Sequence, residues 1–160
     1  MTKLFQAFFT GIFFTFILDF FLFLGLKLNY IDILQINVYY NILFADHQNI
    51  YIYLVFSAFL GFIITYIDNQ KLNALTLGIL FSLVSLTLIP PIGKYVGELM
   101  FLKKGITLQD AKRSYQGDIY YYGRKEVKFY DYKLKKVIIL KRNRLDFLHN
   151  IDIPQRDKEG

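Results

Sequence analysis

The sequence lacks cysteine and tryptophan and contains only two histidines. Without cysteine the chain cannot build a disulfide scaffold, a zinc–thiolate centre or an iron–sulfur cluster, and it has no thiol nucleophile. Two histidines also exclude a three-histidine metal site. Glycine-rich phosphate loops, G-x-S-x-G nucleophile motifs and H-E-x-x-H zinc motifs are all missing. We therefore expect a protein that is not an enzyme, with no catalytic residues, no cofactor and no metal.

Charge is scarce in the first part of the chain and abundant in the second. Residues 1–93 contain three lysines, four aspartates and no arginine, a net charge of −1. Residues 94–160 contain sixteen basic and nine acidic residues, a net charge of +7. Hydrophobic residues make up 54% of the 160 residues, and the mean hydropathy is +0.32. These values are typical of a small polytopic membrane protein whose membrane part ends at Pro90-Pro91.

Three apolar runs are long enough to cross a bilayer as helices. They cover residues 4–26, 50–67 and 72–89, and the first would span roughly 34 Å at the helical rise. Only four polar residues, 68–71, separate the last two runs, so these helices must be antiparallel neighbours. A cleaved signal peptide is the alternative for the first run. It fits poorly, because the apolar core is too long and no small-residue cleavage pattern follows it.

Residues 29–49 permit three interpretations: an interfacial segment, a short fourth membrane helix inside the bundle, or an extracytoplasmic strand. Polar residues lie on opposite helical faces here, and residues 36–42 also alternate as a strand would. Four crossings would place both chain ends and most lysines in the cytoplasm, as the positive-inside rule favours. We therefore favour a helix over residues 31–44, although it would be only ~21 Å long.

Small residues recur at every fourth position in all three runs. In lipid, helices gain little from hydrophobic contact with one another, so such rows allow their backbones to approach closely. The alternative is that this spacing of small residues arose by chance. We predict that Gly11, Gly61 and Gly78 are helix-packing residues. The three rows are Ala7, Gly11 and Thr15; Ser57, Gly61 and Thr65; and Ala74, Gly78 and Ser82.

Asp19 continues the first row by one more step of four. A carboxylate in mid-membrane costs on the order of 2.5–3.5 kcal/mol on insertion scales, so it should face the bundle interior. The functional interpretation is a proton or cation site. The structural one is a hydrogen-bonded polar lock to a neighbouring helix, and we prefer it because no second acid lies deep in a run.

The part that follows the double proline divides into three segments. Residues 94–106 are expected to form an interfacial amphipathic helix, with Lys103 and Lys104 reaching lipid phosphates. Residues 107–149 are expected to form a small basic α+β domain. It would have a short helix between Thr107 and Gly117 and an antiparallel meander of strands 118–122, 125–130 and 134–141. Residues 150–160 resemble a flexible tail.

Basic and aromatic residues interleave along the predicted strands, and four of them are candidates for partner or lipid binding: Tyr120, Tyr122, Arg124 and Tyr130. Such a surface also occurs in single-stranded nucleic-acid binders. We expect no nucleic acid, because cytoplasmic segments of membrane proteins are basic for topological reasons. A sheet of this size is marginal alone. Its apolar face would need the short helix, the membrane, a second copy or another protein against it.

The sequence thus predicts a membrane α-helical bundle of three or four segments, residues 1–93, with a C-terminal α+β appendage. Its composition, rich in Phe, Ile, Asn, Lys and Tyr, suggests a low-GC bacterium. We expect a multi-pass protein of the bacterial inner membrane with a cytoplasmic appendage. The leading function is a non-enzymatic accessory, anchoring or assembly subunit that contacts lipid and a protein partner or a second copy. The alternative is proton- or ion-coupled transport centred on Asp19.

Overall fold

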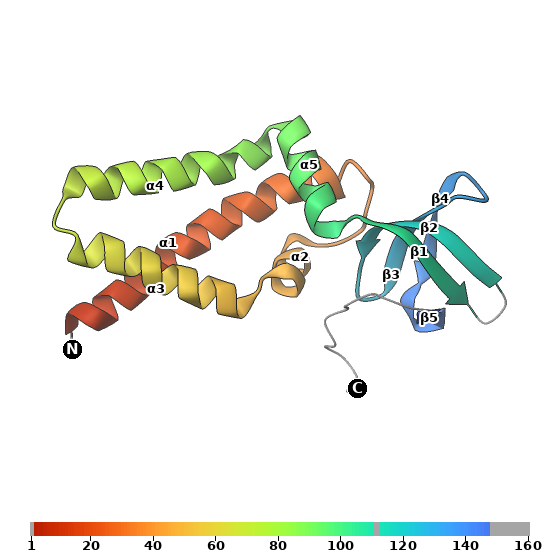
Figure 1. Cartoon of the computed structure of the whole chain (residues 1–160), viewed down its shortest axis with the longest axis horizontal. Coiled ribbons are helices and arrows are strands. Elements are labelled where there is room, and N and C mark those ends of the chain that lie inside the picture. The colour runs from red at the N-terminus through yellow and green to blue at the C-terminus, as the bar shows by residue number, and fades with distance from the viewer. Residues whose placement is uncertain (1, 111–112, 148–160) are drawn as a thin grey trace. The chain divides into compact units, whose positions relative to one another are not determined.

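The chain forms two compact units in the computed structural model, Met1–Leu99 and Met100–Gly160. The model describes residues 2–110 and 113–147, and Figure 1 traces them in chain order. The first unit is helical, and the second is an antiparallel sheet. The predicted fold class, an apolar helical bundle followed by a meander sheet, is confirmed. The predicted tail, residues 150–160, lies outside the described residues.

Long apolar helices make up the first unit (Figure 1). Helix α1 (Thr2–Leu26) continues into the π-helical turn η1 (Lys27–Ile31). Helix α3 (Ile50–Tyr66) is followed by α4 (Gln70–Ser85), which the 3₁₀ turn η2 (Leu86–Leu88) prolongs. Within the described residues, α1 with η1 and α4 with η2 are each long and apolar enough to cross a membrane. Helix α3 reaches that length only together with α2 (Tyr40–His47).

The expected fourth crossing over residues 31–44 is wrong. Helix α2 has only eight residues, about 12 Å at the helical rise, and it is bent by 86° from α3. The bend follows from the local sequence, because Gln48 is extended and the Asn49 side chain accepts the N–H groups of Tyr51 and Ile52. This N-cap starts a new helix at Ile50.

The helices run alternately up and down. Ala7 meets Gly61 and Gly11 meets Ser57, so α3 is antiparallel to α1. Helix α4 turns back after residues 67–69 and therefore runs in the direction of α1 (Figure 1). If both α1 and α4 cross a bilayer in the same direction, the chain between them must cross back. The fold thus favours three crossings, with α2 and α3 together as the middle one.

Helix α5 (Pro90–Phe101) begins at the double proline, which is favourable because the first turn of a helix has no use for its N–H groups. Gly93 and Gly97 are buried, whereas Tyr95 and Leu99 are exposed. A helix is therefore present in the predicted segment 94–106, but it begins at Pro90 and ends at Phe101, and its position at the membrane interface stays a prediction. Lys103 and Lys104 belong to the first strand and not to this helix.

The described strands form one sheet in the order β4-β3-β2-β1-β5, and all neighbours are antiparallel. The predicted meander of residues 118–141 is present as part of this sheet. The predicted short helix after Thr107 is wrong, because Thr107 pairs with Gln116 across two strands. Leu108 points into the core between exposed or half-buried neighbours, which is a strand pattern. The strands are β1 (Lys103–Asp110), β2 (Arg113–Tyr122), β3 (Glu126–Asp131), β4 (Lys136–Lys141) and β5 (Leu145–Phe147).

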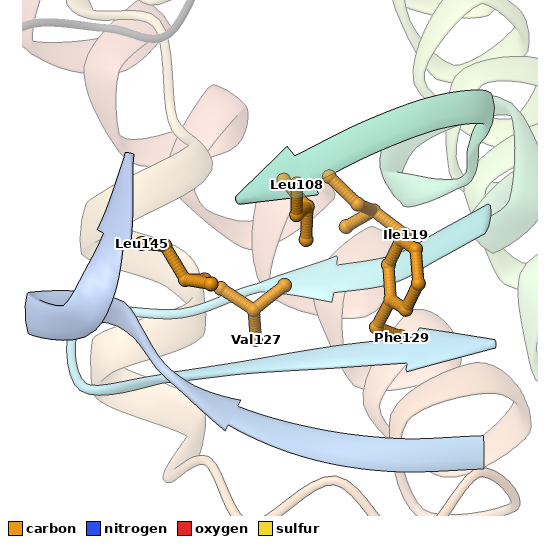
Figure 2. Close-up of a cluster of buried hydrophobic side chains, with 5 residues drawn as sticks. All are labelled: Leu108, Ile119, Val127, Phe129 and Leu145. Carbon is orange, nitrogen blue, oxygen red and sulfur yellow. The ribbon is translucent and has the colours of Figure 1, made fainter. Parts of the chain in front are cut away.

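The sheet curls around its own apolar core. Strands β4 and β5 lie at opposite edges of the sheet, yet only the 3₁₀ turn Arg142–Arg144 joins them. Four residue steps reach at most about 14 Å, so the two edges must approach each other. Figure 2 shows the enclosed core side chains, Leu108, Ile119, Val127, Phe129 and Leu145. The sheet therefore buries its apolar face without the external partner that its small size suggested.

We predict that Val127→Ala destabilises the sheet and that Val137→Ala does not. Val127 is fully buried, whereas Val137 is 43% exposed, so the same truncation removes core contacts only in the first case. The expected loss in the free energy of opening is about 2 kcal/mol for Val127→Ala and below about 0.5 kcal/mol for Val137→Ala. Hydrogen exchange of β2 and β3 amides in the intact chain measures both. Equal effects would contradict the enclosed core.

Candidate functional site

The backbones of α1 and α3 touch at two glycines. A Cβ atom on Gly11 would lie 2.7 Å from the carbonyl carbon of Ser57 and 2.9 Å from the nitrogen of Gly61. A Cβ atom on Gly61 would lie 2.8 Å from the carbonyl carbon of Ala7 and 3.0 Å from the nitrogen of Gly11. No side chain fits at either position. Two of the predicted packing glycines therefore meet each other, as small-residue rows in membrane helices do.

Gly78 differs from these two glycines. A Cβ atom there would meet no atom within 4 Å, and α4 buries none of its side chains. The row of Ala74, Gly78 and Ser82 is exposed along its whole length. Gly78 is therefore not a packing residue among the described residues, although α4 meets α1 elsewhere, through Phe81 and Phe21.

Asp19 lies opposite the break between α2 and α3. The Gln48 amide Nε2 donates a hydrogen bond of 2.7 Å to the Asp19 carboxylate. Two tyrosines fasten the same region to α1, because the Tyr40 hydroxyl donates to the Phe20 carbonyl and the Tyr53 hydroxyl donates to the Ile12 carbonyl, both at 3.0 Å. This geometry is that of a polar lock, which holds the bent segment against α1.

A second close-packed joint lies where α1, η2 and α5 meet, and sequence reasoning missed it. Asn29 Nδ2 donates a hydrogen bond of 2.8 Å to the Thr87 carbonyl, and both residues are buried. Gly25 and Gly93 pack directly on Thr87 and Gly97 on the Tyr30 ring, where a Cβ atom would clash. The sequence does contain a signal for this joint, because Gly93 and Gly97 are spaced by four residues directly after the double proline.

Three tyrosines group on one face of the sheet. The rings of Tyr120 and Tyr130 stack with centroids 6.3 Å apart, and Tyr132 meets Tyr130 edge-on at 6.1 Å. The Tyr132 hydroxyl donates a hydrogen bond to the Asp118 carboxylate, which also accepts the Gly105 N–H at 2.9 Å. The hydrogen bond to Asp118 raises the pKa of Tyr132 above its ordinary value. Two of the three predicted tyrosines therefore share a surface.

Tyr122, the third predicted tyrosine, lies on the opposite face. A bulge between Ile119 and Tyr121 shifts the register so that Tyr122 pairs with Val127 and packs against the core. Burial raises the pKa of Tyr122, and the guanidinium of Arg142 lies over its ring, 4.9 Å from the centroid. Tyr122 is therefore not placed to bind a partner together with Tyr120 and Tyr130.

The predicted basic residues lie at separate places in the sheet. Lys103 and Lys104 are exposed at the start of β1, next to the irregular pairing at Gly105, whose φ is +67°. Arg124 is exposed in the turn between β2 and β3. Lys104 directly precedes Gly105, whose N–H donates to the Asp118 carboxylate that also binds Tyr132, whereas Arg124 lies in a different turn.

Among residues 2–110 and 113–147, no group of three or more histidine, aspartate and glutamate side chains is placed to hold a metal. No protein-family model, curated protein or solved structure matches the chain. The candidate sites are therefore judged by geometry alone. They are the open row on α4, the lock at Asp19 and the tyrosine-bearing face of the sheet.

We predict that Gly61→Leu destabilises the helical unit and that Gly78→Leu leaves it unchanged. Gly61 lies against the α1 backbone, so a leucine there must push the helices apart, whereas Gly78 faces open space. The expected cost for Gly61→Leu is about 3 kcal/mol by overpacking. Thermal unfolding in mild detergent, followed by circular dichroism, compares the two variants. Equal stability of both would show that the Gly11–Gly61 contact does not hold the helices together.

Proposed function

We propose that this protein is a non-enzymatic accessory or anchoring subunit of a membrane protein complex in the bacterial inner membrane. Its helices would anchor the basic sheet at the cytoplasmic surface and offer α4 to a transmembrane helix of the partner. The observation that carries this proposal is the open small-residue row on α4.

Helix α4 has two different sides. Its half-buried residues, among them Asn73, Thr76 and Leu80, lie on one side. Ala74, Gly78 and Ser82 lie on the other, exposed side, where a Cβ atom on Gly78 would meet no atom within 4 Å. Together with η2, the helix is long and apolar enough to cross a membrane. A membrane helix thus presents a small-residue row that the described residues leave uncovered.

The packing of α1 on α3 supports a helix as the ligand of this row. Gly11 and Gly61 belong to rows with the same four-residue spacing, and there the two backbones touch. Lipid chains solvate large apolar side chains as well as a protein does, but close backbone approach is available only between helices. A partner helix with a small-residue row of its own would fit the exposed side of α4.

The charges at the two ends of the helical unit support an orientation. The end at which α1 begins and α3 meets α4 carries Lys3 and Lys71. The other end carries Lys27 and Lys94, and the net charge of +7 of residues 94–160 follows it. By the positive-inside rule the second end is cytoplasmic. With three crossings, the N-terminus would then lie on the opposite side from the sheet, and not in the cytoplasm as four crossings required.

We predict that reporters at the two chain ends give opposite locations. Alkaline phosphatase should be active when fused before Thr2, and green fluorescent protein should fluoresce when fused after Gly160. The reciprocal fusions, phosphatase at the C-terminus and fluorescent protein at the N-terminus, serve as controls and should be silent. Cytoplasmic signals from both ends would contradict three crossings.

We predict that Gly78→Leu abolishes co-purification of the partner without unfolding the chain. A Cβ atom at Gly78 would meet no atom within 4 Å among the described residues, so we expect the variant to fold. Ala58→Leu is the control, because Ala58 is also exposed, on α3, and receives nearly the same added bulk. Retention of every partner by Gly78→Leu, in matched amounts of folded protein, would refute the role of this row.

A single cysteine introduced at Gly78 identifies what binds to the exposed side of α4. The chain has no cysteine, so Gly78→Cys allows cross-linking from this position alone in native membranes. We expect a cross-link to another protein, and none from Thr76→Cys on the opposite side of α4. A disulfide-linked dimer of this chain would instead identify a second copy as the occupant.

The transport alternative is separated by Asp19→Asn. Asparagine keeps an oxygen that accepts the Gln48 amide hydrogen bond, so the lock and the partner complex should persist. A proton- or ion-coupled role requires the carboxylate and would be lost while assembly stays intact. We expect wild-type function and assembly for this variant. Loss of the cellular phenotype with the complex intact would favour transport.

A further inference from the structure

We propose that the β3–β4 hairpin binds the anionic headgroups of the membrane in which the helices are anchored. This inference concerns the sheet, and it goes beyond the proposed protein contact on α4. The hairpin surface is defined by the following residues: Tyr132, Lys133, Leu134, Lys135, Lys136, Val137 and Ile139.

Apolar side chains are exposed along this hairpin although the sheet has an enclosed core. Leu134 is 51% exposed in the turn itself, and Val137 and Ile139 on β4 are 43% and 59% exposed. Val137 pairs with Tyr130 and Ile139 with Lys128, on the face away from the core. Single exposed apolar residues are common, but a contiguous group marks a binding surface.

The charge of the hairpin complements an anionic surface. Residues 132–139 contain three lysines and no acidic residue. Lys133, Lys135 and Lys136 are exposed beside Leu134. Aliphatic residues that enter the headgroup region, flanked by lysines that meet phosphates, are the combination by which peripheral segments bind anionic bilayers.

The turn is held in one conformation before it meets a ligand. Asp131 is buried, and its carboxylate oxygen accepts the N–H groups of Lys133 at 2.7 Å and Leu134 at 2.9 Å. The Tyr132 N–H donates to the Gln116 carbonyl at 2.9 Å. The left-handed backbone of Lys135, with φ of 51°, completes the turn. A turn with a fixed shape loses little conformational entropy on binding.

Lipid fits this surface better than a nucleic acid or an acidic protein does. Only Leu102 separates the end of α5 from the start of β1, so the chain tethers the sheet directly to the helical unit. Such a short tether gives the hairpin a high effective concentration of lipid. Nucleic-acid binding would require free aromatic rings for stacking. Here the most exposed apolar side chains, Leu134 and Ile139, are aliphatic, and the Tyr132 hydroxyl is bonded to Asp118.

The test uses tryptophan fluorescence, because the chain has no tryptophan of its own. Leu134→Trp is placed in nanodiscs of phosphatidylcholine alone and in nanodiscs that also contain phosphatidylglycerol. We expect blue-shifted emission, and quenching by brominated lipid, only in the anionic discs. Asn143→Trp, an exposed position in the 3₁₀ turn outside the hairpin surface, is the control and should show water-like emission in both.

Charge removal tests the lysines. Replacement of Lys133, Lys135 and Lys136 by glutamine should lower the ratio of docked to free hairpin on the order of 100-fold and abolish the blue shift. The matched control replaces Arg113, Lys125 and Lys141 by glutamine. It removes the same charge from exposed positions elsewhere in the sheet and should leave the shift in place.

Three outcomes overturn the proposal. They are water-like emission of Leu134→Trp in anionic discs, a blue shift of equal size in both kinds of disc, and a blue shift in detergent without lipid. The last would mean that protein covers the hairpin. Hydrogen exchange of residues 133–136 in the unaltered chain, compared between the two discs, repeats the test if a variant fails to fold. No change there also overturns it. The Gly78 experiments are unaffected by these results, so the two proposals fail separately.

Discussion

The contact between the backbones of Gly11 and Gly61 is the constraint on which the helical unit depends. It fixes α3 antiparallel to α1, at a separation that no side chain can enter. In the same antiparallel register, Tyr53 reaches the Ile12 carbonyl and Gln48 reaches Asp19. The bend that the Asn49 N-cap produces therefore lies beside Asp19, and the Asp19 carboxylate has a structural partner at the point where the chain turns.

The packing of α4 depends on the same contact. Because α3 occupies the small-residue row of α1, α4 is held mainly near its two ends. Asn73 donates to the carbonyls of Ile64 and Ile67, and Thr87 is buried against Gly25. Its middle is left with an open row at Gly78. This open row, which the described residues leave uncovered, is the observation behind the proposed accessory role.

The sheet encloses a core although it is small. The connection from β4 to β5 brings the two edges together, so Val127 and Phe129 are buried without help from another protein. The apolar residues that stay outside, chiefly Leu134 and Ile139, therefore need an explanation of their own. Their position beside lysines on a rigid hairpin is the basis of the proposed lipid contact, as the open row on α4 is the basis of the proposed protein contact.

Features that depend on neighbouring residues could be predicted from the sequence: three apolar helices, the strands of the meander, and the four-residue spacing that brings Gly11 to Gly61. The fold was needed to decide which rows are used, because the rows at Gly61 and Gly78 have the same pattern and differ only in what faces them. It also decided that Thr107 lies in a strand and that a bulge turns Tyr122 toward the core. The physical reason is that helix partners, strand register and sheet closure join residues far apart in the chain, and local periodicity carries no record of them.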